Sequence, residues 1–131
     1  RLVEFIAQDL SIMAWSLAAL GWRNHPLLDA LAESAMAKLS CGDTQNLSNT
    51  AWAFATMSVE HPPLMAAISA EAIARSRELS PQDISTTAWS FATFVLQDCP
   101  LMDSLAAAAI RRCPQFDAQH LANTAWSCAV L

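Results

Sequence analysis

Residues 45–57 read QNLSNTAWAFATM, and residues 82–94, 37 positions later, read QDISTTAWSFATF. The same interval separates four tryptophans that each follow an alanine: Trp15, Trp52, Trp89 and Trp126. A fixed period of about 20 to 50 residues indicates that one supersecondary unit is copied and stacked. We therefore predict a repeat array, whose function depends on what its stacked surface binds.

The period extends through the whole copy. A glutamine recurs seven residues before each tryptophan, and a Pro-Leu pair recurs in the second half of three copies, at residues 26–27, 63–64 and 100–101. Hydrophobic residues make up 54% of the chain, which has two glycines and no tyrosine, while the helix formers alanine and leucine are abundant. No apolar run approaches the roughly 18 residues of a membrane helix, so we expect no membrane insertion.

Each copy reads as two helices joined by a turn. In the second copy, the core face of the first helix is indicated by apolar residues at i, i+4, i+7 and i+8, namely Leu47, Ala51, Phe54 and Ala55. Residues that cap helix starts precede these helices at Asp43, Ser80 and Asp117. The second helices are expected to start near the Pro-Leu pairs, with Asn24 and Asp98 as caps, and to run to about Ser40, Glu78 and Arg112.

The predicted fold is therefore all-α: an α-solenoid of 37-residue helix-turn-helix repeats, about 3.5 of them, in a right-handed superhelix. Residues 1–131 are expected to form a single segment, with phases near 6–42, 43–79, 80–116 and a partial 117–131. Arg1 shares the phase of a second-helix end, and Leu131 falls inside a first helix. We therefore expect the sequence to be an excerpt of a longer repeat array.

Small polar residues occupy the arc of the first helices opposite the core. Stacked in phase, they would form parallel rungs of hydrogen-bonding groups, which reading successive bases of single-stranded RNA requires. The alternative is that the hydroxyl residues face the neighbouring helix, where small size permits close approach. The first copy departs, because Ile12 and Met13 replace the polar pair. The candidates for RNA binding are Asn46, Asn49, Thr50, Asp83, Thr86, Thr87, His120, Asn123 and Thr124.

The four tryptophans stand at the border between the apolar side and the polar arc. An exposed indole could stack on a base, but we predict that they form a structural repeat core, as packing wedges whose N–H groups each find an acceptor. A basic row is in phase at Lys38, Arg75 and Arg112. It could contact phosphates, but we favour cations that offset helix dipoles, because the net charge of −5 repels nucleic acid.

Four cysteines share no repeat phase and form no CxxC pair: Cys41, Cys99, Cys113 and Cys128. We predict neither a zinc site nor disulfides, but buried free thiols in a reducing compartment. The three histidines are scattered, and neither a Ser-His-Asp set nor a glycine-rich phosphate loop is present. We therefore predict that the chain is not an enzyme and has no cofactor, metal or small-molecule substrate.

The two quoted strings resemble the heptatricopeptide repeat, a 37-residue helical repeat of organellar RNA-binding proteins. They are also similar to the octotricopeptide repeat and to the helical repeats of FAST-kinase-domain proteins. The resemblance covers the whole chain and implies an α-solenoid that binds RNA in mitochondria or plastids, often ahead of a RAP domain, of which no segment is visible here. By matching position it places recognition on the first helices, at Asn46, Asn49, Asp83, Thr86, His120 and Asn123.

Two classes of function follow. The first is an RNA-binding module in organellar RNA processing, RNA stability or ribosome assembly, with single-stranded or ribosomal RNA as partner. The second is a scaffold that binds protein subunits of a larger complex, because solenoids present concave surfaces to proteins equally well. The acidic charge favours the scaffold. At one base per repeat, this array would hold about four nucleotides.

Overall fold

The computed structural model describes residues 5–94 and 96–130, and in that part of the chain it contains helices and no strand. The predicted all-α solenoid is confirmed. The predicted positions of Arg1 and Leu131 lie outside the described residues. The α-helices are α1 Ala7–Leu20, α2 His25–Met36, α3 Thr44–Thr56, α4 Pro62–Ala74, α5 Pro81–Thr93, α6 Cys99–Arg112 and α7 Ala118–Val130, with short 3-10 helices at η2 Leu39–Cys41 and η3 Cys113–Gln115.

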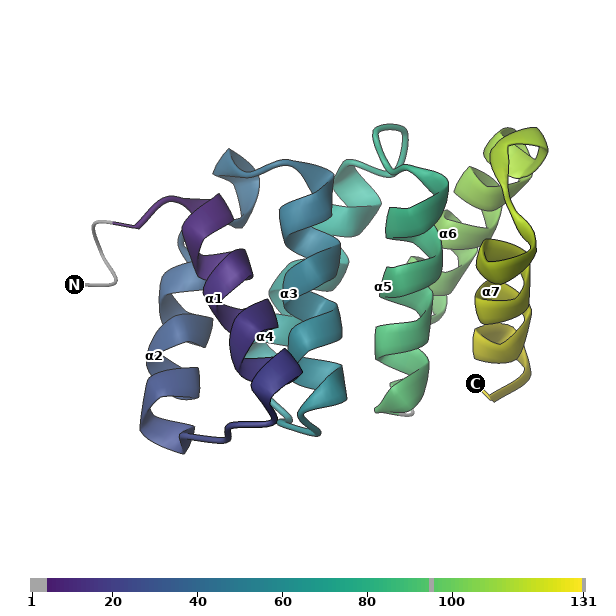
Figure 1. Cartoon of the computed structure of the whole chain (residues 1–131). Coiled ribbons are helices and arrows are strands. Elements are labelled where there is room, and N and C mark those ends of the chain that lie inside the picture. The colour runs from purple at the N-terminus through teal and green to yellow at the C-terminus, as the bar shows by residue number, and fades with distance from the viewer. Residues whose placement is uncertain (1–4, 95, 131) are drawn as a thin grey trace.

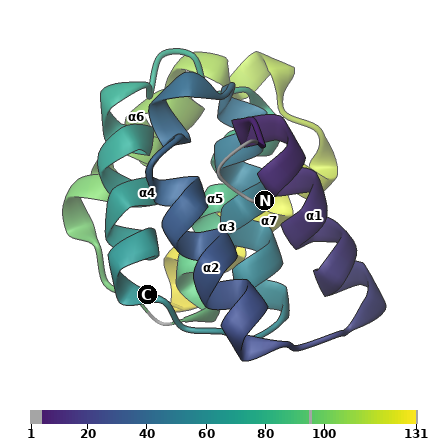
Figure 2. The ribbon, with the colours of Figure 1, turned by 90° about the vertical axis from the view of Figure 1, so that its left-hand side faces the viewer.

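The helices stack in two layers. The first helices of the repeats, α1, α3, α5 and α7, follow one another in a row across the molecule (Figure 1), and each contacts the next more extensively than any other element. The second helices, α2, α4 and α6, form the other layer, and Figure 2 looks along both layers from the end at which α1 and α2 lie. None of the described helices combines the length and apolarity needed to cross a membrane. The handedness of the superhelix stays a prediction.

Side chains close the first turn of the helices at the predicted positions. Asp43 accepts a hydrogen bond from the backbone N–H of Asn46 at 2.8 Å, and Ser80 and Asp98 cap α5 and α6 in the same way. A cap that the sequence did not predict is His61, whose Nδ1 accepts from the N–H of Leu64 at 3.1 Å. The free N–H groups of a first turn need such acceptors.

Two of the second helices end earlier than predicted. Helix α2 stops at Met36 rather than Ser40, and α4 stops at Ala74 rather than Glu78. After α4 the chain leaves the helix and buries the side chain of Leu79 completely. The helix ends predicted from the sequence do not account for this burial, because helical periodicity indicates which face of a helix is buried and not where a loop residue enters the core.

The core lies between the two layers and repeats with the sequence. Phe54 and Phe91, which share one phase, are both buried, and so are Leu47 and Ile84 in another. The second helices contribute Leu31, Ile68 and Leu105, which are also in phase and buried. The core face predicted for the first helices is therefore confirmed.

Polar contacts link successive first helices beside this core. The hydroxyl of Ser11 on α1 donates to Asn46 Oδ1 on α3 at 3.0 Å. One repeat later, Asp83 on α5 accepts from Ser48 Oγ at 3.0 Å and from Thr44 Oγ1 at 2.8 Å, both on α3. Asp83 also accepts from the N–H of Ser80, so its carboxylate connects the cap of α5 to the neighbouring repeat.

Replacement of Asp83 by alanine tests this connection. Asp83 is 4% exposed, and its loss would leave the Ser48 hydroxyl buried without its carboxylate. We expect Asp83→Ala to lower the free energy of unfolding by about 2–3 kcal/mol in urea denaturation. Asp9, at the same phase of α1, is exposed and only closes its own helix start. Asp9→Ala should cost less than about 1 kcal/mol, and equal losses would contradict the assigned role.

Candidate functional site

The nine candidate residues divide by depth. Thr50, Asp83 and Thr87 are buried between the helices, as the alternative interpretation of the hydroxyl residues described. Thr50 Oγ1 donates to the carbonyl of Asn46 at 2.7 Å, and Asp83 is occupied by the contacts between α3 and α5. These three residues cannot meet a base without opening the contact between repeats. Their burial favours a role in the contact between repeats, and their assignment to a recognition surface stays a prediction.

Three more candidates are half-buried and engaged near helix starts. Asn46 accepts from Ser11. His120 lies against Asp117, with Nδ1 3.2 Å from Oδ1, and its ring meets the edge of Phe116 at 5.9 Å between centroids. Thr124 Oγ1 donates to the carbonyl of His120 at 2.8 Å. Their side chains are committed to the protein, so they are weaker candidates for recognition.

The remaining candidates are Asn49, Thr86 and Asn123. All three are half-buried, and no hydrogen bond of their side-chain polar atoms is found within the described residues. They share one phase, on α3, α5 and α7. Each can therefore still donate and accept a hydrogen bond with a ligand.

Each of these three residues follows a glutamine by four positions and precedes a tryptophan by three. The three side chains of each set lie on one face of their helix, because positions i, i+4 and i+7 line one side. The repeated glutamine is not among the RNA-binding candidates predicted from the sequence, although its spacing from the tryptophan could have identified it. We call this surface the amide-indole face. It consists of Gln45, Asn49, Trp52, Gln82, Thr86, Trp89, Gln119, Asn123 and Trp126, preceded on α1 by Gln8, Ile12 and Trp15.

The four tryptophans differ in depth, Trp52 packs against the hydrophobic core, and the role of all four as a structural repeat core stays a prediction. Trp15 and Trp126 are 48% and 47% exposed, and Trp52 and Trp89 are half-buried. No acceptor for their indole N–H groups is found within the described part of the chain. The rings of Trp15 and Trp52 stack, with centroids 6.3 Å apart and planes inclined by 27°. The indoles therefore lie along the surface of the first-helix row, where a base can reach them.

A polar groove crosses this face at α5 and α7. It encloses about 230 Å³ and contains no charged side chain. Carboxamides, a hydroxyl and two indoles line it: Trp52, Gln82, Thr86, Trp89, Gln119 and Asn123. Such a lining suits a flat, uncharged ligand with hydrogen-bonding edges.

The basic row joins repeats to one another. The Lys38 ammonium donates to the carbonyl of Phe5. Arg75 Nη1 donates to the carbonyl of Gly42 at 2.7 Å, and Arg112 Nη2 to that of Arg77 at 3.0 Å. Each cation thus reaches a loop of the preceding copy. Arg112 lies in the last turn of α6 and Arg75 stands at the C-terminal cap of α4, so the interaction with the helix dipole stays a prediction and the contact between repeats adds to it. The hydrogen bonds to loop carbonyls also occupy groups proposed for phosphate.

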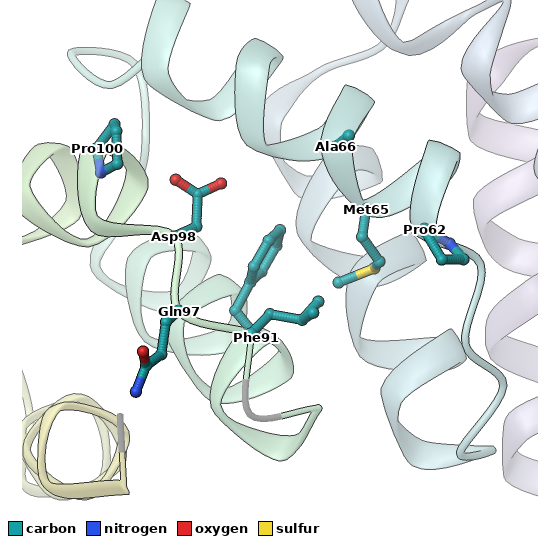
Figure 3. Close-up of a pocket in the computed structure, with 8 residues that line it drawn as sticks. Pro62, Met65, Ala66, Phe91, Gln97, Asp98 and Pro100 are labelled. Atoms are coloured by element: carbon teal, nitrogen blue, oxygen red, sulfur yellow. The ribbon is translucent and has the colours of Figure 1, made fainter.

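A second hollow, of about 330 Å³, is mostly apolar and lies where α4, α5 and α6 meet. Figure 3 shows Met65 and Ala66 of α4 on one side and Pro100 of α6 on the other. Its carboxylate, Asp98, caps α6 and accepts a hydrogen bond from the Ser69 hydroxyl. A carboxylate held in this way is a structural element, so the hollow suits apolar contact rather than chemistry.

The cysteines differ from the prediction. All four are free but exposed, rather than buried. Cys99 and Cys113 stand at the two ends of α6, where side chains reach the surface. Within the described residues, no group of three or more potential ligands is arranged to hold a metal ion.

Comparison with known proteins places the chain in an RNA-related context. Residues 2–131 match the family model described as "RNA-editing substrate-binding complex 6 protein". The match spans every helix that the structure describes. A search of curated proteins gave no match. The family name does not mention the heptatricopeptide repeat.

Replacement of Arg75 tests the role of the basic row. Arg75→Met keeps the alkyl stem but removes the hydrogen bond to the Gly42 carbonyl together with the hydrogen bonds to Glu78 Oε2 within its own repeat. We expect a loss of about 1–2 kcal/mol in the free energy of unfolding, since hydrogen bonds from charged groups are the stronger ones. Arg77, which is exposed, provides the control, and Arg77→Met should change stability by less than about 0.5 kcal/mol. Similar effects in chemical denaturation would contradict the assignment.

Proposed function

Because the chain belongs to the RNA-editing substrate-binding complex 6 protein family, we propose that it is an RNA-binding helical-repeat module of an RNA-processing complex. We also propose kinship with the heptatricopeptide repeat, based on the shared 37-residue period and the Ala-Trp spacing. That kinship would place the protein in mitochondria or plastids. In this proposal the chain binds RNA without catalysing a reaction on it.

The observation that carries the proposal is the amide-indole face. Its carboxamides and hydroxyl have unused hydrogen-bonding capacity, and its indoles lie at the surface in register on four successive helices. Stacking on aromatic rings and hydrogen bonding to base edges are the two means by which proteins recognise single-stranded RNA. The face combines both in each of the last three copies.

The charge of the chain indicates which interactions would bind RNA to the amide-indole face. The net charge is −5, and the phase-locked cations are bound to loop carbonyls of neighbouring copies. Phosphate contacts would therefore contribute little, and affinity would depend on stacking and hydrogen bonds. A binding constant that changes little with salt is the expected result, because few counterions are released. Other subunits of the complex would supply the cationic surface.

A scaffold role is the second candidate, supported by a different surface. The apolar hollow beside Met65 is lined by Ala66, which is exposed on α4, and by Pro100 of α6. This surface involves the second helices, so it could contact a protein subunit while the amide-indole face contacts RNA. Ribosome assembly and ribosomal RNA stay predictions from the resemblance, and the family match gives them no support.

The combined replacement of Asn49, Thr86 and Asn123 by alanine tests the RNA-binding face. We expect at least a tenfold weaker affinity for single-stranded RNA in fluorescence anisotropy, because about 1 kcal/mol is lost per hydrogen bond. The melting temperature should stay within about 2 °C, since these side chains make no hydrogen bonds within the described structure.

The matched control removes hydroxyls from the other layer. Ser34 and Ser104 are half-buried on α2 and α6, and Ser34→Ala with Ser104→Ala should leave RNA affinity unchanged. Crosslinking of the whole protein in the organelle provides the independent check. Recovery of protein partners without RNA would refute the RNA-binding proposal and favour the scaffold.

A further inference from the structure

The polar groove at α5 and α7 is the part of the amide-indole face where indoles border a hollow. On α1 and α3, the rings of Trp15 and Trp52 stack, so the sides that face each other are occupied. No ring contact of this kind joins Trp52 to Trp89 within the described residues, and both indoles instead border the groove. An aromatic surface is therefore available there to a ligand.

The polar lining of the groove defines the edge of that ligand. Gln82, Gln119 and Asn123 contribute three carboxamides, and Thr86 contributes a hydroxyl. Each carboxamide presents a donor and an acceptor side by side, so it pairs with a ligand edge of the opposite pattern. No charged group lines the groove, which disfavours a phosphate or a carboxylate as the occupant. A flat ring with adjacent donor and acceptor atoms is the ligand that fits.

Among the nucleobases, adenine fits this lining best. On the edge that carries N7, adenine presents the N6 donor beside the N7 acceptor and pairs with asparagine or glutamine, whereas guanine presents two acceptors, O6 and N7, which pair with arginine or lysine, and the groove lacks both. A purine also offers a larger stacking surface to an indole than a pyrimidine does. We propose that the groove binds an unpaired adenine of single-stranded RNA, stacked on Trp89 and paired by a carboxamide of α5 or α7. This inference rests on the proposed function.

A base held in this way must leave the helical stack, because an indole occupies the position of its stacking neighbour. The groove would therefore accept single-stranded RNA and exclude a duplex. It would also fix the register of the strand on the array, since the first copy offers less: Ile12 replaces the amide, and one side of Trp15 is occupied by Trp52.

Titration of the intact chain with RNA oligomers of about eight nucleotides tests the inference. The probes are oligoadenylate, oligouridylate, oligocytidylate, a uridine oligomer with one central adenine or guanine, and a duplex of oligoadenylate with oligouridylate. We expect oligoadenylate to bind about tenfold more tightly than either pyrimidine oligomer, and a central adenine to be preferred over guanine. Gln82→Met combined with Asn123→Leu should reduce the preference to less than about threefold at an unchanged melting temperature.

The stacking component has its own variant and control. Trp89→Leu should weaken binding to all of the oligomers by about tenfold, whereas Trp22→Leu should not, because Trp22 is 56% exposed but lies between α1 and α2, away from the face. If Trp89→Leu loses helicity, Gln119→Met and Thr86→Val test the groove without changing its indoles.

The outcomes separate the two proposals. RNA binding without a base preference, unaffected by the amide variants, would overturn the adenine site and leave the RNA-binding function intact. Equal binding of single strands and duplexes would also overturn the site. A chain that binds none of the oligomers would overturn both.

Discussion

The close packing of successive first helices is the constraint on which the rest of the structure depends. Alanines at one phase, Ala14, Ala51 and Ala88, are buried in every contact, and a serine one turn earlier is buried beside them. Because these side chains are small, the helices approach along their length, and Ser48 comes within hydrogen-bonding distance of Asp83 on the next helix. This contact fixes the register of one copy against the next.

That packing also determines which groups remain at the surface. A seam of alanine and serine has no room for an indole, so the tryptophans lie outside it and form a row with the glutamines and asparagines. The cations in phase, such as Arg75, are bound to loop carbonyls of the preceding copy. A chain of net charge −5 thus presents a neutral surface with stacking and hydrogen-bonding groups. The proposed RNA binding would therefore depend on bases rather than on phosphates.

The period in the sequence predicted the helices, the core face and the caps at Asp43 and Ser80, because these depend on local patterns that repeat. It did not predict the depth of residues at the border of a face. The sequence pattern predicts recognition for Asp83, which is buried between repeats, and packing for Trp126, which is 47% exposed. Depth there is set by the distance between neighbouring helices, which no single helix encodes.

RNA binding through the amide-indole face is tested most directly by following the five indole N–H resonances of the chain in nitrogen-15 NMR spectra while single-stranded RNA is added. Trp22 lies off the first-helix row and serves as the internal reference. If RNA binds there, we expect the signals of Trp52 and Trp89 to shift or broaden most and the signal of Trp22 to stay in place. RNA binding through this face would be contradicted by shifts confined to Trp22. It would also be contradicted by shifts of backbone signals from α4 and α6 while the indole signals of the first helices stay unchanged.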